Sequence, residues 1–399
     1  MKRVLATSAL SLFAIGAQAQ SSVTLYGIVD TGIGYLSSSA PSVGATSGGH
    51  SVVKMINGIW AGSRFGLKGS EDLGGGTAAI FTLEEGFNSA TGAQSTSGLA
   101  FNRQAYVGLT NPAYGTFTAG RQYTAYYTLL SPYSPTTWLT GAYGAHPGDL
   151  DSLDTTYRVN NSLVYQSPSF RGLKVAGSYS VGGVAGSLDA GSTWSAAVQY
   201  LNGPFGIAAG FQRINNATNG GAQTWSANST TNPLPVSSIN AGYQGAQAQQ
   251  RVAVTGGYAF SKQWDVSFSY SNVQYIPGTH SGFTSEAVFN TAGAVLHFKP
   301  VPTLDLAAGY SYTRASEANG ITSGASYNQF NLSQYYSLSK RTGLYALEAY
   351  QRANGKTLAS PAAGGGIINA TASIGDGQNG TPSSSRSQVG VGVGIITKF

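Results

Sequence analysis

The last thirteen residues alternate between two kinds of side chain, and this pattern constrains the fold more than any other feature. In SQVGVGVGIITKF (residues 387–399), one set of alternate positions carries mainly Val and Ile and ends at Phe399, while the other carries mainly Gly. A period of two predicts a β-strand with one apolar face. Because a terminal strand leaves an unpaired edge, the pattern also predicts a partner strand elsewhere in the chain.

The composition narrows the class of protein. Only 9% of the 399 residues are charged, whereas roughly 25% is typical of soluble domains. The 24 Tyr and 16 Phe argue against a disordered chain. Because there is no Cys, the chain has no disulfide framework, thiolate metal site or thiol nucleophile.

The N-terminus has the three parts of a secretory signal. Lys2 and Arg3 precede an apolar segment at 4–16, and Ala17-Gln18-Ala19 fits an A-x-A cleavage site. We expect a signal peptide at 1–19 and a single domain at 20–399. The alternative is a membrane anchor, but the apolar run is shorter than the ~20 residues that a spanning helix needs. Cleavage removes two of 21 basic residues, leaving 19 against 15 acidic residues and a net charge of +4.

The same alternation recurs along the rest of the chain. In one example, Trp264, Val266, Phe268 and Tyr270 alternate with Asp and Ser. Seven short, turn-like connections and eight longer ones separate sixteen such segments. The predicted strands lie at 22–37, 50–68, 77–87, 100–109, 116–122, 157–167, 172–182, 192–202, 205–213, 249–260, 264–275, 286–298, 303–315, 326–338, 342–353 and 386–399.

An even number of strands with short turns at one end and long loops at the other predicts an all-β fold, a 16-stranded antiparallel transmembrane β-barrel. Closure pairs the last strand with the first and leaves no free edge. Phe399 then lies at the membrane interface, where aromatic side chains are favoured. A secreted β-sandwich or β-solenoid is the alternative, but it does not explain the asymmetry of the connections.

Several stretches resemble the general porins of Gram-negative bacteria, particularly the β-proteobacterial type. They are SSVTLYGIVDTGIGY (21–35), SRFGLKGSEDLGGGTAAIFTLEEGF (63–87), FNRQAYVGLTNPAYGTFTAGRQY (101–123) and YRVNNSLVYQSPSFRGL (157–173), together with the terminal Phe399. The resemblance implies a homotrimer in the cell outer membrane, in contact with lipid and lipopolysaccharide. It also implies a water-filled pore in each protomer, a third extracellular loop folded into the lumen, and a terminal Phe recognised by the outer-membrane assembly machinery.

Three predicted loops exceed thirty residues. The segment 123–156 carries Tyr, Leu, Trp and Pro in its first half, so we expect it to be the loop that packs on the inner wall. The segments 214–248 and 354–385 are rich in Asn, Thr, Ser and Gly and are expected to face solvent. The alternative is that 123–156 is an ordinary extracellular loop.

Charged residues in this framework predict a pore constriction. The resemblance implies a ladder of lumenal arginines, which the matching motifs carry onto Arg64, Arg103 and Arg158; Arg121 is a further candidate. Side-chain parity agrees, because Arg64 shares a face with Lys68, and an Arg facing lipid at mid-depth costs about 2–4 kcal/mol. The alternative for each arginine is a structural pairing with a carboxylate at the rim.

Acidic residues form the other side of the predicted constriction. The third loop ends with Asp149, Asp151 and Asp154, which the resemblance implies face the arginines. Asp30 and Glu84 lie on the polar parity of their strands, where they either balance the arginines or bind loop backbone.

These features predict a general diffusion pore with a weak to moderate anion preference and no cofactor. The alternative is a channel specific for a sugar or an organic anion, lined by aromatic residues of the third loop. An enzyme is not expected, because G-x-S-x-G and H-E-x-x-H motifs are absent and the four His are scattered. Three of the histidines, His146 among them, fall in predicted loops and are expected to be solvated. The net charge of +4 is not clustered, so we expect no binding of nucleic acid.

Overall fold

The computed structural model describes residues 22–154, 157–221, 225, 236–361, 365–376 and 381–399; the predicted signal peptide lies outside them. The main strands are β1 (Ser22–Ser39), β2 (His50–Asn57), β3 (Arg64–Gly74), β4 (Thr77–Gly86), β5 (Gln104–Asn111), β6 (Gly115–Gln122), β7 (Val159–Gln166), β8 (Leu173–Ser180), β9 (Thr193–Asn202), β10 (Phe205–Asn215), β11 (Ala248–Ala259), β12 (Trp264–Ile276), β13 (Ala287–Val301), β14 (Leu304–Ala315), β15 (Ser326–Ser337), β16 (Thr342–Asn354) and β21 (Ser387–Lys398).

Short elements occupy the long connections. They are α1 (Ala125–Leu130), η1 (Ser131–Tyr133), η2 (Pro135–Thr137), α2 (Gly141–Gly144), η3 (Pro147–Asp149), η4 (Ala241–Tyr243), β17 (Lys356–Leu358), β18 (Ile367–Asn369), β19 (Ser373–Ile374) and β20 (Thr381–Pro382). Among the described residues, no helix is long and apolar enough to cross a membrane.

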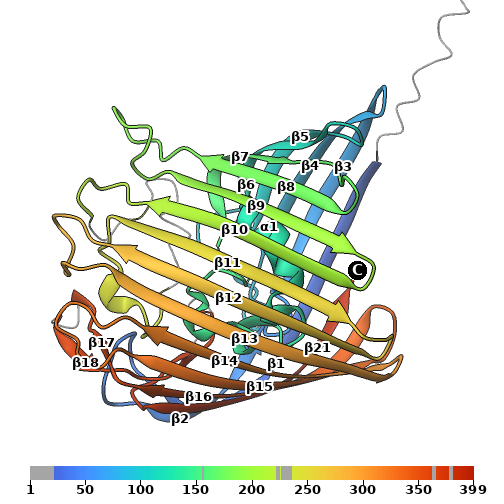
Figure 1. Ribbon diagram of the computed structural model, residues 1–399. Helices are drawn as coiled ribbons and strands as arrows, with labels where there is room; N and C mark the ends of the chain where they lie inside the picture. Colours follow the sequence, from blue (N-terminus) through green and yellow to red (C-terminus); the bar gives the residue numbers. More distant parts are fainter. Residues whose placement is uncertain (1–21, 155–156, 222–224, 226–235, 362–364, 377–380) are drawn as a thin grey trace, which may run out of the picture.

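The strands form a closed antiparallel barrel, as the sequence predicts (Figure 1). Each strand from β3 to β16 pairs with the next along the chain, and β16 pairs with β21. The last strand returns to the first, from Ile28 opposite Lys398 to Leu36 opposite Gly390. The backbones of Gly27 and Phe399 then exchange two hydrogen bonds of 3.0 Å. The final residue therefore belongs to the seam that closes the barrel.

The predicted strand 50–68 is wrong in one respect, because it is interrupted at 58–63. β2 and β3 lie one after the other along the same edge of β1 and share one of the sixteen positions in the wall. Asp30 stabilises the interruption: one carboxylate oxygen accepts a bond from the Ala61 amide (2.7 Å) and the other from the Tyr345 hydroxyl (2.6 Å). The Asn57-Gly58 pair, a turn signal, marks the end of β2.

The two faces of the wall follow the predicted alternation. On β12, Phe268 and Tyr270 are 57% and 49% exposed on the outer face, whereas Ser269 and Ser271 are buried inside the barrel. Such an apolar exterior matches the hydrocarbon of a bilayer, and the polar interior matches water.

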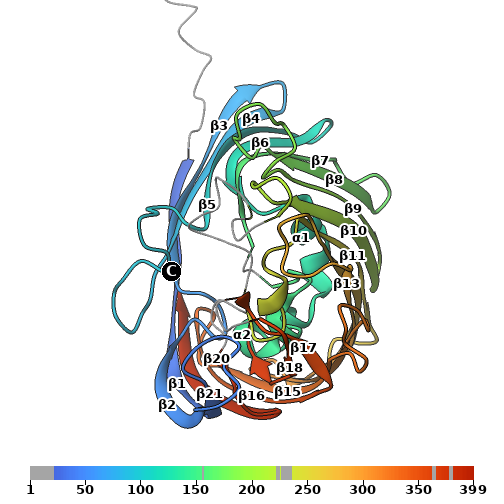
Figure 2. The same ribbon diagram turned by 90° about the vertical axis from the view of Figure 1, so that its left-hand side faces the viewer.

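The segment 123–154 folds into the lumen, which confirms the prediction for the third loop (Figure 2). Leu129 and Leu130 of α1 are buried against small residues that point inward from β8 to β11: Ala176, Ala197, Ala208 and Ala253. The approach is close, because a side chain at Gly206 would put its Cβ 1.8 Å from the Tyr133 hydroxyl. Polar wall residues satisfy the loop backbone: the Gln199 amide donates to Leu129 O (2.8 Å) and the Thr255 hydroxyl to Leu130 O (2.9 Å).

The prediction that the loops 214–248 and 354–385 face solvent holds for some described residues, such as Ile367 at 43% exposure, but it is wrong for others. Tyr243 is buried against the rings of Tyr275, Phe283 and Phe289, with centroid distances between 5.3 and 5.7 Å. Ile374 in the later loop is 1% exposed. A few apolar side chains in each segment are therefore sufficient to pack part of it against the barrel, although most of the segment is polar.

Candidate functional site

Three charged groups from neighbouring strands meet on the inner wall. The Arg103 Nε donates to Glu84 Oε1 at 2.7 Å, and the Arg64 Nε lies 3.7 Å from Glu84 Oε2. The Tyr26 hydroxyl donates to the same Glu84 oxygen at 2.9 Å. Antiparallel pairing places these residues together, since Arg64 begins β3, Glu84 lies on β4 and Arg103 precedes β5.

Tyr123, the first residue after β6, joins a third arginine to this group. Its hydroxyl oxygen accepts bonds from Arg158 Nη2 (2.8 Å) and Arg103 Nη2 (3.2 Å), and the Arg158 guanidinium lies over its ring at 4.9 Å. Burial raises the pKa of the Tyr123 phenol, but the two guanidinium groups outweigh burial and lower it. We call Arg64, Glu84, Arg103, Tyr123 and Arg158 the arginine cluster.

The charge of the arginine cluster is unbalanced. Counted over these five residues alone, it contains three guanidinium groups and one carboxylate, a formal excess of two positive charges. The Arg103 side chain keeps 10% of its surface accessible and the Arg64 side chain 22%, while Arg158 is buried. Arg64 is therefore the arginine of the cluster most open to a solute in the lumen.

Arg121 lies apart from these bonds. The register between β6 and β7 shifts between Gly120 and Gln122, which turns Arg121 out of the regular alternation. Its Nε donates to Asn102 O (2.6 Å) and its Nη1 to the Asn160 side chain. Its hydrogen bonds therefore lead to Asn102 and Asn160 and not to Glu84 or Tyr123.

The three aspartates of the third loop occupy different surroundings. Asp151 binds His146 Nδ1 (2.6 Å) and the Ser271 hydroxyl of β12 (2.7 Å), on the wall that carries the loop. Asp149 accepts a bond of 3.1 Å from the Asp154 amide. Asp154 is close enough to Tyr127 of α1 to affect its pKa, which is raised first by burial, then by Tyr123 and then by Asp154. The ring of Tyr127 stacks on that of Tyr123, with centroids 4.7 Å apart.

Two other predicted lumenal residues have local roles. The Asp30 carboxylate supports the interruption between β2 and β3, which is one of the two alternatives that parity leaves open. Lys68 is exposed, and its ammonium lies 5.5 Å from the centre of the Tyr26 ring.

The sequence analysis misplaces one buried residue with a basic side chain and does not identify another. His146 is 2% exposed, so its predicted solvation is wrong; its Nε2 lies 3.1 Å from the Ser269 hydroxyl, and with Asp151 it fixes the loop to β12. Arg251 on β11 is 1% exposed and lies 5.5 Å from the centre of the Tyr157 ring. Its alternation with the exposed Val252 and Val254 was the available signal for an inward position.

The aromatic residues of the third loop divide into two groups. Tyr126 and Tyr143 are 0% and 4% exposed and pack the loop onto the wall. Trp138 is half-buried and borders a cavity near the short connections. Within the described residues, no group of three or more His, Asp or Glu is arranged to hold a metal ion.

Comparison with known proteins agrees with this architecture. A family model described as Gram-negative porin matches residues 6–358. The chain belongs to this porin family. An outer membrane porin protein of Bordetella pertussis is 37% identical over 238 residues, which cover 55% of this porin and 60% of that protein. Outer membrane porin protein 32 of Delftia acidovorans is 31% identical over 233 residues, 55% of this chain and 62% of that one.

These alignments span only about 60% of the relatives' length. Among solved structures, an anion-selective porin from Comamonas acidovorans superposes with a TM-score of 0.66 at 23% identity, over 95% of this chain and 100% of that chain. The trimer form of OmpT from Vibrio cholerae gives a TM-score of 0.64 at 16% identity, over 95% and 99% of the two chains. At these identities the structural likeness shows the fold. Family and closed barrel together place this porin in the outer membrane of a Gram-negative bacterium.

Proposed function

We propose that the protein is a water-filled channel for passive diffusion of small hydrophilic solutes and ions across the outer membrane. The observation that carries this proposal is the division of the lumen. The third loop contacts the wall from β8 to β11 and again at β15 and β16, and leaves the arginine cluster on the wall from β3 to β7. A diffusion pore needs a constriction that filters solutes by size and charge, and no chemical step.

The excess positive charge favours anions at this constriction. At 6 Å, one fixed charge acts on a passing ion by about 0.7 kcal/mol even at the dielectric constant of water. The arginine cluster carries two positive charges in excess, and Asp154 offsets part of them from the loop. The anion-selective porin of similar fold supports the same sign. The preference is weak to moderate and declines with salt, because screening sets in beyond about 8 Å at physiological ionic strength.

Planar lipid bilayers test this proposal directly. Purified protein should give discrete current steps, with a reversal potential in a KCl gradient that indicates chloride over potassium. Linear uptake of neutral solutes below a size limit would fit a general pore. A complete lack of conductance from protein that migrates as folded barrel would overturn the proposal.

The assembly that we propose is a homotrimer in contact with outer-membrane lipid and lipopolysaccharide. Among the described strands, β2 pairs with β1 and with no other, so its second edge is free, while Val53 and Met55 are 70% and 54% exposed. Glu348 lies opposite the outward-facing Leu332 and Val391, where lipid would be unfavourable. A neighbouring protomer over these strands would cover both. Unheated gels should show a trimer that becomes a protomer band on boiling, slightly below the 41.0 kDa of the full sequence because the predicted signal peptide is removed; a detergent complex with the mass of one protomer would contradict it.

We also propose that the outer-membrane assembly machinery recognises the C-terminal residue. The Phe399 ring packs over Gly27, where an added Cβ would lie 2.2 Å from the ring. Deleting Phe399 removes that packing and two hydrogen bonds at the seam. We expect normal synthesis and export with a reduced yield of heat-modifiable protein in the outer membrane. A Phe399→Tyr variant is the control, because it keeps an aromatic ring and the backbone bonds.

A further inference from the structure

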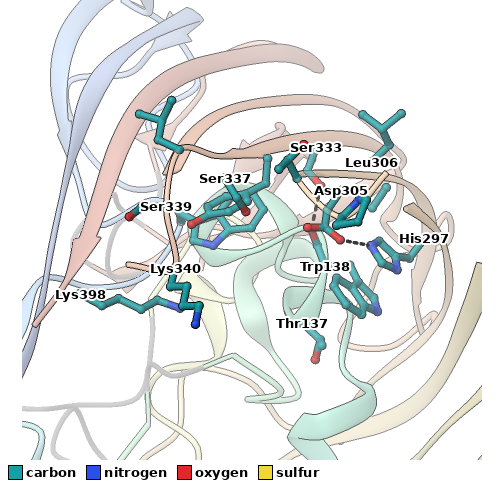
Figure 3. Close-up of a pocket in the computed structure, with 16 residues that line it drawn as sticks. Thr137, Trp138, His297, Asp305, Leu306, Ser333, Ser337, Ser339, Lys340 and Lys398 are labelled. Carbon is teal, nitrogen blue, oxygen red and sulfur yellow. Dashed lines mark hydrogen bonds and ion pairs between the residues drawn. The ribbon is translucent and has the colours of Figure 1, made fainter. Parts of the chain in front are cut away.

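A cavity of about 580 Å³ opens inside the barrel at the end with the short connections (Figure 3). Trp138 and Thr137 border it from the third loop, Asp305 from β14 and Tyr335 from β15. Trp60 reaches it from the interruption between β2 and β3. The volume lies in the range of sites for small molecules, about 300–1,000 Å³.

The aromatic rings of the cavity are held in fixed positions. The Trp138 indole stacks on the His297 imidazole, with centroids 3.6 Å apart and planes within 4°. The Ser333 hydroxyl donates to the Trp138 carbonyl at 2.7 Å. Trp60 packs on Tyr335 at 4.7 Å. Two half-buried indoles therefore border the cavity with little freedom to move away.

The charges of the cavity are positive in excess. Both Asp305 oxygens lie 2.7 Å from Lys299 Nζ, and one of them lies 3.0 Å from His297 Nε2, so this carboxylate is already bound. Lys340 and Lys398 are exposed, and no acidic partner for either appears among the described residues. Figure 3 shows both lysines on the side of the cavity away from His297.

We infer that this cavity binds a planar organic anion, an aromatic carboxylate, with its ring against Trp60 and Trp138 and its carboxylate at Lys340 and Lys398. Aromatic faces favour a flat ring in offset or edge contact, and an ammonium favours a carboxylate. An anion is favoured over a sugar, because the Asp305 carboxylate is already bound whereas Lys340 and Lys398 have no acidic partner among the described residues. The inference deepens the proposed function, because the anion would reach the site through the channel; the binding step itself does not require conduction.

Calorimetry on folded protein in detergent tests the binding step. With benzoate as the probe, we expect saturable heat. Cyclohexanecarboxylate has the same charge without the aromatic ring and should bind roughly three- to tenfold more weakly. The double variant Lys340→Gln/Lys398→Gln should weaken benzoate binding at least about fivefold, and Trp138→Leu should reduce the difference between the two carboxylates. Lys262→Gln is the matched control, since Lys262 is exposed in another short connection at the same end and does not border the cavity.

Current measurements separate this inference from the proposed channel. Benzoate should reduce the chloride current saturably in the parent, and less in the double lysine variant. If the protein conducts normally but calorimetry detects no binding of benzoate, the proposed binding site is wrong and the proposed channel function stands. If benzoate binds but the protein does not conduct, the channel function is wrong and the binding site stands. Equal affinity for both carboxylates, or tight binding of glucose, would also overturn the assignment to an aromatic anion. Heat-modifiable migration on gels verifies that each variant is folded.

Discussion

Inward positions on opposite sides of the lumen differ in size and charge. Beneath α1, from β8 to β11, they are occupied by small residues such as Ala197 and Ala208, and the loop lies in contact with them. From β3 to β7 they include Arg64 and Glu84, with Arg158 directly before β7. Antiparallel strands form both sides, and their inward side chains distinguish the wall that receives the loop from the wall that remains open to solutes.

The difference between the two walls shows how the lumen of a barrel can acquire selectivity. Small residues let the loop approach, and hydrogen bonds from wall side chains to the loop backbone, such as the one from the Gln199 amide to Leu129 O, hold it there. The loop thereby displaces the lumen toward the opposite wall, where Arg64 and Arg103 share the Glu84 carboxylate. The position of the loop and the charge of the far wall are therefore two parts of one filter, and each can be changed separately.

The largest effect is expected from removing charge on the open wall. Arg64→Gln combined with Arg103→Gln removes two positive charges, each worth about 0.7 kcal/mol at 6 Å, so the chloride-to-potassium permeability ratio should fall by up to about tenfold in dilute salt. Reversal potentials across a KCl gradient measure it. Arg171→Gln, in the short connection before β8, is the control. An unchanged reversal potential in the double variant would mean that the cluster does not line the filter.

A smaller change of opposite sign is expected from Glu84→Gln. Removing this carboxylate raises the excess on the wall from two positive charges to three, so anion preference should increase roughly threefold in dilute salt. Glutamine keeps an oxygen that can accept from Arg103. Reversal potentials measured alongside the arginine variants give the comparison, and a shift toward cations would contradict the assigned geometry. Thermal melting monitors stability, because Arg103 loses its ionic partner.

The other wall is tested by weakening the loop's apolar contacts. Leu129→Ala and Leu130→Ala each remove a buried side chain, at about 2–5 kcal/mol per site. Because the strands of the wall are unaffected, we expect the barrel to assemble while the loop detaches. Single-channel conductance and the size limit for neutral solutes should both increase, with little change in ion preference. Leu163→Ala, on the outer face of β7, is the control. If it changed conductance and the size limit as much as the two loop substitutions do, the result would argue against loop detachment.

Most of the barrel could be predicted because its signals are local. Period-two alternation assigns faces, and short turns delimit hairpins, so fifteen of the predicted strands match single observed strands. The exception at 58–63 depends on Asp30, which is distant in sequence. Parity likewise gives the face of Arg103 and Glu84 but not their contact, which requires the strand register. His146 is misjudged because the burial of a loop residue depends on the wall beneath it.

The smallest effect concerns the polar attachment of the loop at Asp151. Burial raises the pKa of this carboxyl, but the adjacent His146, together with the Ser271 hydroxyl and Arg251, outweighs burial and holds the pKa below its usual range. A lowered folded-state pKa means that the ionised carboxylate stabilises the loop above roughly pH 4, and that this contribution is lost only as the pH falls through the lowered value. The parent current should therefore stay steady between pH 7 and pH 5.

Asp151→Asn weakens charged hydrogen bonds worth about 1.5–3 kcal/mol each, so we expect more frequent current fluctuations at both pH values, with conductance close to that of the parent. Glu286→Gln makes the same change in net charge at an exposed position and should leave the fluctuations unchanged. If Asp151→Asn instead shifted the reversal potential as strongly as Glu84→Gln, Asp151 would belong to the filter and not to the attachment of the loop.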